Sequence, residues 1–169
     1  RTDPSRSGAG GAIGDIGTHA FNAAAFVTGE IPKSLYADLT SFVPGRQLDD
    51  SANILLRYES GAKGMLWASQ IAVGNENALS LRVYGEKGGL EWHHRVPDEL
   101  WFTPYGEPKR LITRNGAGAG AAANRVSRVP SGHPEGYLEG FATIYREAAD
   151  AIIAKREGKA AAGEVIYPG

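Results

Sequence analysis

The sequence contains no cysteine, so disulfide bonds and thiolate metal ligands are excluded. It also lacks a long apolar run: no stretch approaches the roughly 18 apolar residues that cross a bilayer. The first residues lack the apolar core of a signal peptide. We therefore expect a cytoplasmic protein with no membrane partner.

An excess of charge of either sign is missing as well. The 18 Lys and Arg side chains face 19 Asp and Glu side chains, which gives a formal net charge of −1. This even balance gives no excess of positive charge that could attract nucleic acid, so we expect no nucleic-acid partner. The hydrophobic share of 42% is close to that of soluble globular domains. A length of 169 residues suits one domain, so residues 1–169 are predicted to form a single domain.

Methionine is scarce and glycine is abundant. Met65 is the only methionine, so the chain does not open on an initiator residue, and we expect a piece of a longer protein. The 23 glycines are roughly twice the usual share of about 7%. Gly11, Gly14 and Gly17 weaken a predicted helix, which indicates that a ligand or another backbone comes close there.

Two helices are predicted from apolar spacing. The first begins near Gly11 and ends at Gly29, and its apolar face is formed by Ile13, Ile16, Ala20, Ala24 and Val27. The second begins at Pro134 and ends at Gly158. Its three-four spacing predicts one buried face, formed by Tyr137, Leu138, Phe141, Ile144, Tyr145, Ala148 and Ile152. Residues 115–124, which repeat Gly and Ala, are interpreted as a loop.

Strands occupy the middle of the chain. Residues 52–58 and 63–71 alternate with period two around the turn signal at Ser60 and Gly61, which predicts an antiparallel hairpin. Further short strands are expected at 36–43, 79–84, 90–92, 99–103 and 109–113. This order predicts an α+β fold with an open, largely antiparallel β-sheet and helices packed on one face. Because Met65 and Trp67 make the other face apolar, we expect a homo-oligomer that associates through it.

Asp15 and His19 are the leading candidates for chemistry. They stand four residues apart, so on a helix both side chains lie on one face. A carboxylate beside an imidazole favours its protonated form and orients the ring, which can then exchange a proton with a substrate hydroxyl. The alternative is structural: Asp15 complements the helix dipole and His19 packs. Zinc is not favoured, because the spacing identifies no third ligand.

Other polar residues allow two interpretations each. His133, before Pro134, lines a binding site or only caps the helix. Asn75, Glu76 and Asn77 bind a polyol or form a turn. The loop residues Arg46, Asp49 and Asp50 are equally ambiguous, and His93 and His94 are interpreted as solvated. Residues 116–121 match a degenerate dinucleotide pattern, but no βαβ unit surrounds them, so we do not assign a cofactor there.

Five segments together resemble one enzyme family. They are GAIGDIGTH at 11–19, LRYESGA at 56–62, LWASQ at 66–70, RVYGEKGGLEW at 82–92 and GHPEGYLEGF at 132–141. In this order they resemble the C-terminal, substrate-binding domain of the Gfo/Idh/MocA oxidoreductases. The family's N-terminal Rossmann domain, which binds NAD or NADP, has no counterpart here, and neither has its Glu-Lys-Pro motif. The chain also stops, at residues 164–169, before the family's final helix and strand.

The resemblance implies roles for three residues. His19 would be the catalytic acid/base on the substrate hydroxyl, Asp15 would orient it and bind substrate, and His133 would bind substrate. The chain would then be the substrate-binding and catalytic half of an NAD(P)-dependent oxidoreductase acting on CH–OH groups of a sugar, polyol or derivative. By itself it would bind no cofactor and not turn over. The alternative is a non-catalytic module for sugar binding or oligomerisation.

Overall fold

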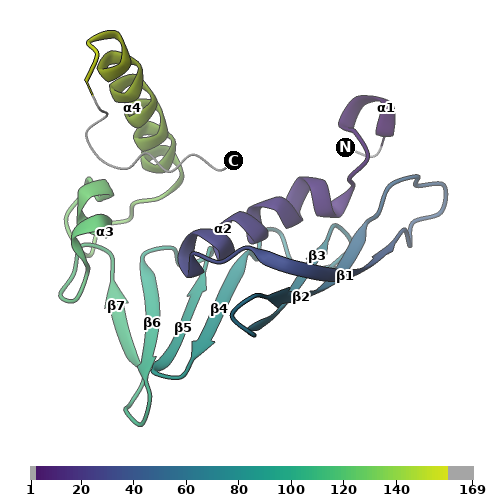
Figure 1. Cartoon of the computed structure of the whole chain (residues 1–169), viewed down its shortest axis with the longest axis horizontal. Helices are drawn as coiled ribbons and strands as arrows, with labels where there is room; N and C mark the ends of the chain where they lie inside the picture. Colours follow the sequence, from purple (N-terminus) through teal and green to yellow (C-terminus); the bar gives the residue numbers. More distant parts are fainter. Residues whose placement is uncertain (1–2, 160–169) are drawn as a thin grey trace. The chain divides into compact units, whose positions relative to one another are not determined.

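The computed structural model describes residues 3–159 (Figure 1). They divide into two compact units, one up to Leu81 and one from Arg82 onward. Both combine helices with antiparallel strands, which confirms the predicted α+β class. The strands divide between two open sheets where the sequence indicates one. That residues 1–169 form a single domain stays a prediction, and residues 164–169 lie outside the described part.

The first unit places a helix on a three-stranded sheet. The strands β1 (Pro32–Thr40), β2 (Ser51–Tyr58) and β3 (Lys63–Ser69) form an antiparallel sheet in chain order. Before them come the short α1 (Pro4–Ser7), the π-helical turn η1 (Ile13–Gly17) and α2 (Thr18–Thr28). The predicted hairpin is confirmed, because Leu55 pairs with Met65 across β2 and β3. Gly29 ends α2 at a φ of 71°, as its predicted capping position requires.

The core of this unit lies between the sheet and the start of the helix. One face of β2 and β3 buries Ala52, Ile54, Leu56, Leu66 and Ala68, and Ile13, Ile16 and Ala20 pack against it. Burying one aliphatic side chain of this size contributes about 1.5–3 kcal/mol. The packing ends earlier than the sequence predicts, since Val27 at the far end of α2 is exposed. The core therefore fixes the first turns of the helix most firmly.

The other face of the same sheet is open and apolar. Tyr36 of β1, Leu55 of β2 and Met65 of β3 are aligned side by side in the strand register. Met65 is 84% exposed, and Trp67, which pairs with Asn53, is 64% exposed. The alternation read from the sequence is thus confirmed: one face is buried and the other presents large apolar side chains.

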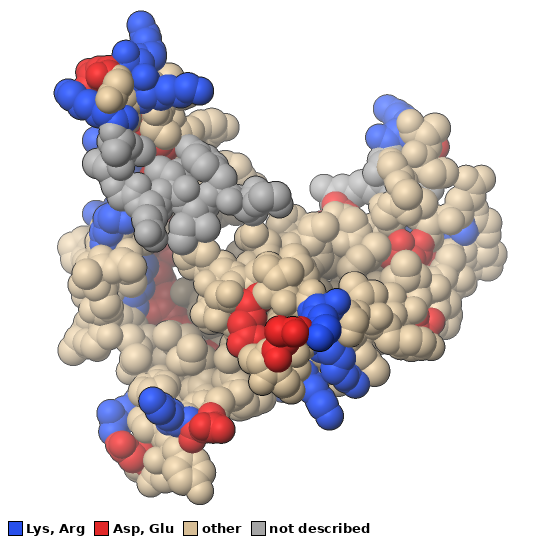
Figure 2. Space-filling view, viewed as in Figure 1, with Lys and Arg blue, Asp and Glu red and all other residues tan. Residues whose placement is uncertain are grey.

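The second unit contains a four-stranded sheet and two helices. Its strands β4 (Ser80–Gly85), β5 (Gly88–His93), β6 (Glu99–Pro104) and β7 (Arg110–Thr113) follow one another in chain order. A short helix, α3 (Ala121–Val126), occupies part of the segment interpreted as a loop, and α4 (Tyr137–Arg156) follows. In Figure 2, Lys and Arg gather at the far end of α4, whose last turn carries Lys155 and Arg156 and so complements the helix dipole.

Two details of α4 correct the sequence analysis. The helix begins at Tyr137 and not at Pro134, because the side chain of Glu135 is held by the backbone N–H groups of Arg128 and Val129. The predicted buried face is exposed, with Leu138 at 77% and Ile144 at 61%. Apolar spacing identified the helix, but no element among the described residues of this unit covers that face. None of the helices described in residues 3–159 has both the length and the apolarity to cross a bilayer.

Candidate functional site

Asp15 and His19 lie at the join between η1 and α2. Asp15 is half-buried in the π-helical turn, and His19 is exposed in the first turn of α2. The turn is wide because the N–H of Thr18 bonds the carbonyl of Ile13, five residues back. Such single π-turns occur frequently at functional sites. The local backbone at Asp15 is therefore unlike the regular α-helix that the sequence predicts.

Asp49, which lies just before β2, holds the start of the helical segment formed by η1 and α2. Its carboxylate accepts hydrogen bonds from the N–H of Gly11 at 2.8 Å and of Ile13 at 2.9 Å, and its carbonyl accepts from Ala12 at 2.8 Å. These bonds satisfy donors that a helix start leaves without partners. A Cβ on Gly11 would overlap the Asp49 carbonyl oxygen. The expected close approach at this glycine is therefore confirmed, and the approaching group is the backbone of Asp49.

Asp50 closes the loop beside the site. Its side chain is fully buried and accepts hydrogen bonds from the N–H groups of Phe42 and Val43, each at 2.9 Å. The bond from Phe42 is the main reason why the pKa of Asp50 is lowered. Arg46 adds a longer ion pair at 3.5 Å. In the structure these ambiguous loop residues hold the segment between β1 and β2 in place.

Gln70 approaches Asp15 from the end of β3. Its amide nitrogen donates to the Asp15 carboxylate at 3.2 Å, and its backbone N–H donates to the carbonyl of Asp50 at 2.8 Å. Sequence reasoning treated Gln70 only as a strand residue. The signal was present, because period two places Gln70 after Leu66 and Ala68 on the buried face. A polar residue continuing an apolar face needs a hydrogen-bond partner.

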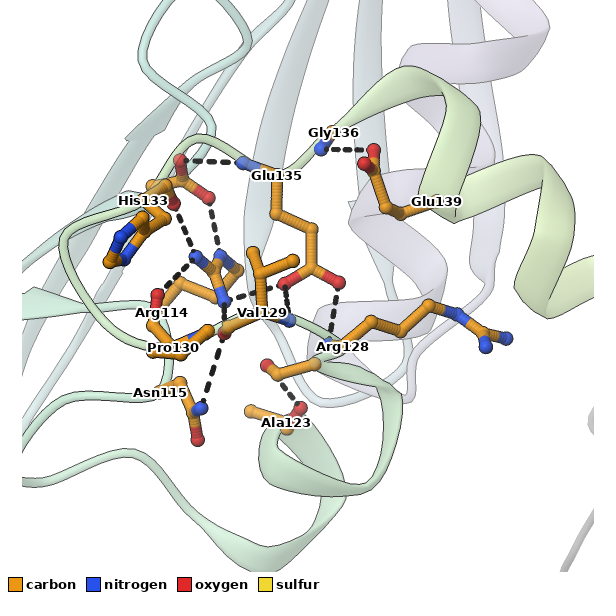
Figure 3. A network of polar contacts seen from close by, with 12 residues as sticks. Arg114, Asn115, Ala123, Arg128, Val129, Pro130, His133, Glu135, Gly136 and Glu139 are labelled. Carbon is orange, nitrogen blue, oxygen red and sulfur yellow. Dashed lines mark hydrogen bonds and ion pairs between the residues drawn. The ribbon is translucent and has the colours of Figure 1, made fainter.

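His133 lies in the second unit, on the loop between α3 and α4. It is exposed, and its carbonyl accepts a 2.6 Å hydrogen bond from the guanidinium of Arg114 (Figure 3). The imidazole points away from that guanidinium. Within residues 3–159 the ring of His133 has no hydrogen-bond partner. The loop thus presents a fixed backbone and an available imidazole.

A half-buried charge network fixes the His133 loop. Arg114, which follows β7, pairs with Asp98 at 2.7 Å and with Glu135 at 2.5 Å. The same guanidinium donates to the carbonyl of Val129 at 2.8 Å. Glu135 is 8% exposed and accepts the N–H of Arg128 at 2.7 Å. Figure 3 shows how these bonds connect both ends of the loop to one arginine. Sequence reasoning did not identify Arg114 or Asp98.

The remaining histidines have structural contacts. His93 bonds Glu91 at 3.0 Å, and Lys109 bonds the other oxygen of the same carboxylate at 2.8 Å. Lys109 and then His93 lower the pKa of Glu91 to about 2. His94 lies beside Trp92, with ring centroids 5.9 Å apart. These contacts agree with the interpretation of both histidines as surface residues.

The remaining candidate segments form turns. Residues 75–77 are exposed, and the N–H of Asn75 bonds the carbonyl of Ala72. Residues 116–121 follow an antiparallel strand, and the N–H of Gly116 bonds the carbonyl of Thr113. A helix does come directly after them, contrary to the sequence analysis, but it is only the six-residue α3. In the part of the chain that the structure describes, no three His, Asp or Glu residues are grouped to hold a metal ion.

Known proteins resemble this chain over its whole described length. The model of the "GFO/IDH/MocA C-terminal domain" matches residues 1–91. The uncharacterized oxidoreductase YfiI of Bacillus subtilis is 34% identical over 171 residues, which cover 99% of this chain and 44% of YfiI. The chain thus spans less than half the length of this relative.

Solved structures give the same result. An oxidoreductase from Sinorhizobium meliloti is 63% identical with a TM-score of 0.87, covering 93% of this chain and 44% of that one. An inositol dehydrogenase homolog from Azotobacter vinelandii, in complex with NADH and myo-inositol, is 32% identical with a TM-score of 0.83. That match covers 87% of this chain and 39% of the homolog.

Proposed function

The chain belongs to the GFO/IDH/MocA family, whose C-terminal domain it matches, and from this premise we propose that it forms the substrate-binding and catalytic half of an NAD(P)-dependent oxidoreductase. The reaction is the interconversion of a CH–OH group and a carbonyl on a sugar, polyol or derivative. The observation that carries the proposal is the placement of Asp15 on a π-turn that Asp49 anchors, four residues before His19 in the first turn of α2. The myo-inositol bound to the Azotobacter vinelandii homolog supports the substrate class.

In this proposal the residues of the chain transfer the proton of the substrate hydroxyl. The cofactor, when bound, accepts or supplies the hydride at the substrate carbon. His19 takes the hydroxyl proton as that carbon is oxidised and returns it in the reverse direction. Asp15 orients the imidazole and binds a substrate hydroxyl, since a carboxylate can hold a histidine ring in one orientation. His133 binds substrate through the imidazole that its loop presents.

The cofactor itself does not fit this chain. A dinucleotide site needs a parallel strand, a glycine turn and a helix in one βαβ unit. In residues 3–159 the glycine-rich run 116–121 follows an antiparallel strand and precedes a short helix. We therefore assign NAD or NADP to an N-terminal domain of the intact parent protein.

The intact parent protein provides the test. We expect its mass to be roughly double 17.9 kDa, since an added domain of ordinary size doubles this chain. With NAD or NADP and a panel of polyols and sugars, the intact protein should form reduced cofactor, measured by absorbance. The 169-residue chain alone should form none under the same conditions. An intact mass near 17.9 kDa, or turnover by the chain alone, would contradict the proposal.

The open face of the three-stranded sheet favours a second role, self-association of the chain. Tyr36, Leu55, Met65 and Trp67 form a contiguous exposed row, and monomeric proteins rarely expose so large an apolar surface. We propose that two copies associate through this face. If the Asp15–His19 pair proves inactive, this association remains as the non-catalytic alternative.

Charge placed on the open face should dissociate the oligomer. We expect Met65→Lys with Trp67→Lys to convert an oligomer into a monomer at micromolar concentration, because buried unpaired charge opposes association. Analytical ultracentrifugation measures the change. Val73→Lys is the control, since Val73 is 98% exposed in the turn after β3, outside the sheet. A wild-type protein that sediments only as a monomer would rule out the association.

A further inference from the structure

We propose that Gln70 belongs to the Asp15–His19 site as a positioning residue that holds the Asp15 carboxyl group in a fixed orientation. The inference rests on the proposed function and adds a residue to its site. It stands on the 3.2 Å hydrogen bond from the Gln70 amide nitrogen to Asp15. It also stands on the way the fold brings these residues together across 55 positions of the chain.

The strand register holds Gln70 in place. Ser51 pairs with Ser69 at the ends of β2 and β3, and the next bond of the ladder joins the N–H of Gln70 to the carbonyl of Asp50 at 2.8 Å. The neighbouring Asp49 binds the first turn of the helix. One end of the sheet thus fixes both the helix start and the amide that bonds Asp15. Backbone hydrogen bonds therefore hold both segments that carry the Gln70–Asp15 contact, the end of β3 and the start of the helix.

Hydrogen-bond chemistry determines which way the amide faces. The NH₂ group of Gln70 points at Asp15, because its nitrogen donates to a carboxyl oxygen of Asp15. The amide oxygen of Gln70 then has no donor among the described residues. It forms an acceptor beside Asp15, where a hydroxyl of a sugar or polyol can donate. The donated hydrogen bond fixes the position of the Asp15 carboxyl group, four residues before His19.

Within residues 3–159, His19, Asp49 and Asp50 are titratable groups on the elements next to Asp15. On α2 His19 follows it, and before β2 stand Asp49 and Asp50. The oxygens of Asp49 are bonded by Gly11 and Ile13, and those of Asp50 by Phe42, Val43 and Arg46. The faces of β2 and β3 toward the helix carry buried apolar side chains. A new charge at position 70 therefore acts first on Asp15, the group that the Gln70 side chain contacts.

Two substitutions at Gln70 test the role. Gln70→Glu places a second carboxylate beside Asp15, which raises the pKa of the acid and of a neighbouring imidazole alike. We expect the acid limb of the kcat/KM profile of the intact enzyme to move to higher pH by about one unit. Gln70→Met keeps the length but removes the donor, and kcat/KM should fall about tenfold, as for a lost hydrogen bond to a charged group. A merely structural role would not move the pH profile.

The control is Gln47→Glu, the same change at an exposed loop residue of the same unit, which should leave the profile unchanged. A second readout does not depend on activity: ¹³C NMR titration of the Asp15 carboxyl should show a raised pKa in Gln70→Glu. An unchanged Asp15 titration in both Gln70 variants would overturn the inference whatever the activity. A shifted titration with full activity of Asp15→Asn would instead overturn the proposed function, and with it the catalytic use of Gln70.

Discussion

His19→Ala is expected to lower kcat of the intact enzyme by roughly a hundredfold or more, the usual loss when a general acid/base is removed. The substitution should leave stability nearly unchanged, because His19 is an exposed residue. Steady-state kinetics with a polyol substrate and a thermal unfolding curve measure the two effects separately. Added imidazole in the buffer should restore part of the rate, since it can replace the missing proton acceptor.

The matched control is His94→Ala, because His94 is also an exposed histidine but lies beside Trp92 of β5, in the second unit. Its kcat should equal that of the wild type. A wild-type rate in His19→Ala would remove His19 from the mechanism. The same rate loss in both variants would show that the effect does not belong to the Asp15–His19 site.

Arg114→Met is expected to give the largest loss of stability, about 3–5 kcal/mol in the free energy of unfolding. Removal of one partner from a buried ion pair costs this much because the other charge stays behind without compensation. Glu135 is 8% exposed, the carbonyl of His133 loses its bond from Arg114, and that of Val129 keeps only the 3.4 Å bond from Asn115. Urea unfolding followed by circular dichroism measures the change. Arg114→Lys should recover only part, because an ammonium cannot reproduce the planar fork of hydrogen bonds.

Arg125→Met provides the comparison for that loss. Arg125 pairs with Glu147 at 2.6 Å, but its side chain is 61% exposed, so the pair is screened by solvent. Exposed ion pairs contribute about 0–1 kcal/mol, and the variant should lose no more than that. Equal losses in Arg114→Met and Arg125→Met would show that the network around the His133 loop is not the stabilising element we describe.

Much of the fold could be predicted because local patterns encode it. Period-two alternation in residues 52–58 and 63–71 identified the hairpin and its two faces, and three-four spacing identified both long helices. Such patterns record which side chains face the core, which is a property of the sequence. They overstated burial along α4, since spacing alone does not say whether a neighbour exists to cover a face. Asp15, His19 and His133 were candidates because a motif can be recognised without any coordinates.

The sequence by itself therefore determined the α+β class, the strand alternation and the motif residues. Only the tertiary structure decided which distant groups support them. Asp49 bonds Gly11, just before the helical turn, across 38 residues, and Gln70 bonds Asp15 across 55 residues. The Glu135 carboxylate bonds Arg114 and the Arg128 N–H, and α4 begins only after this residue, at Tyr137 rather than at Pro134. The physical reason is that a hydrogen bond needs its partners within about 3.2 Å, and only strand register and helix packing bring distant residues that close.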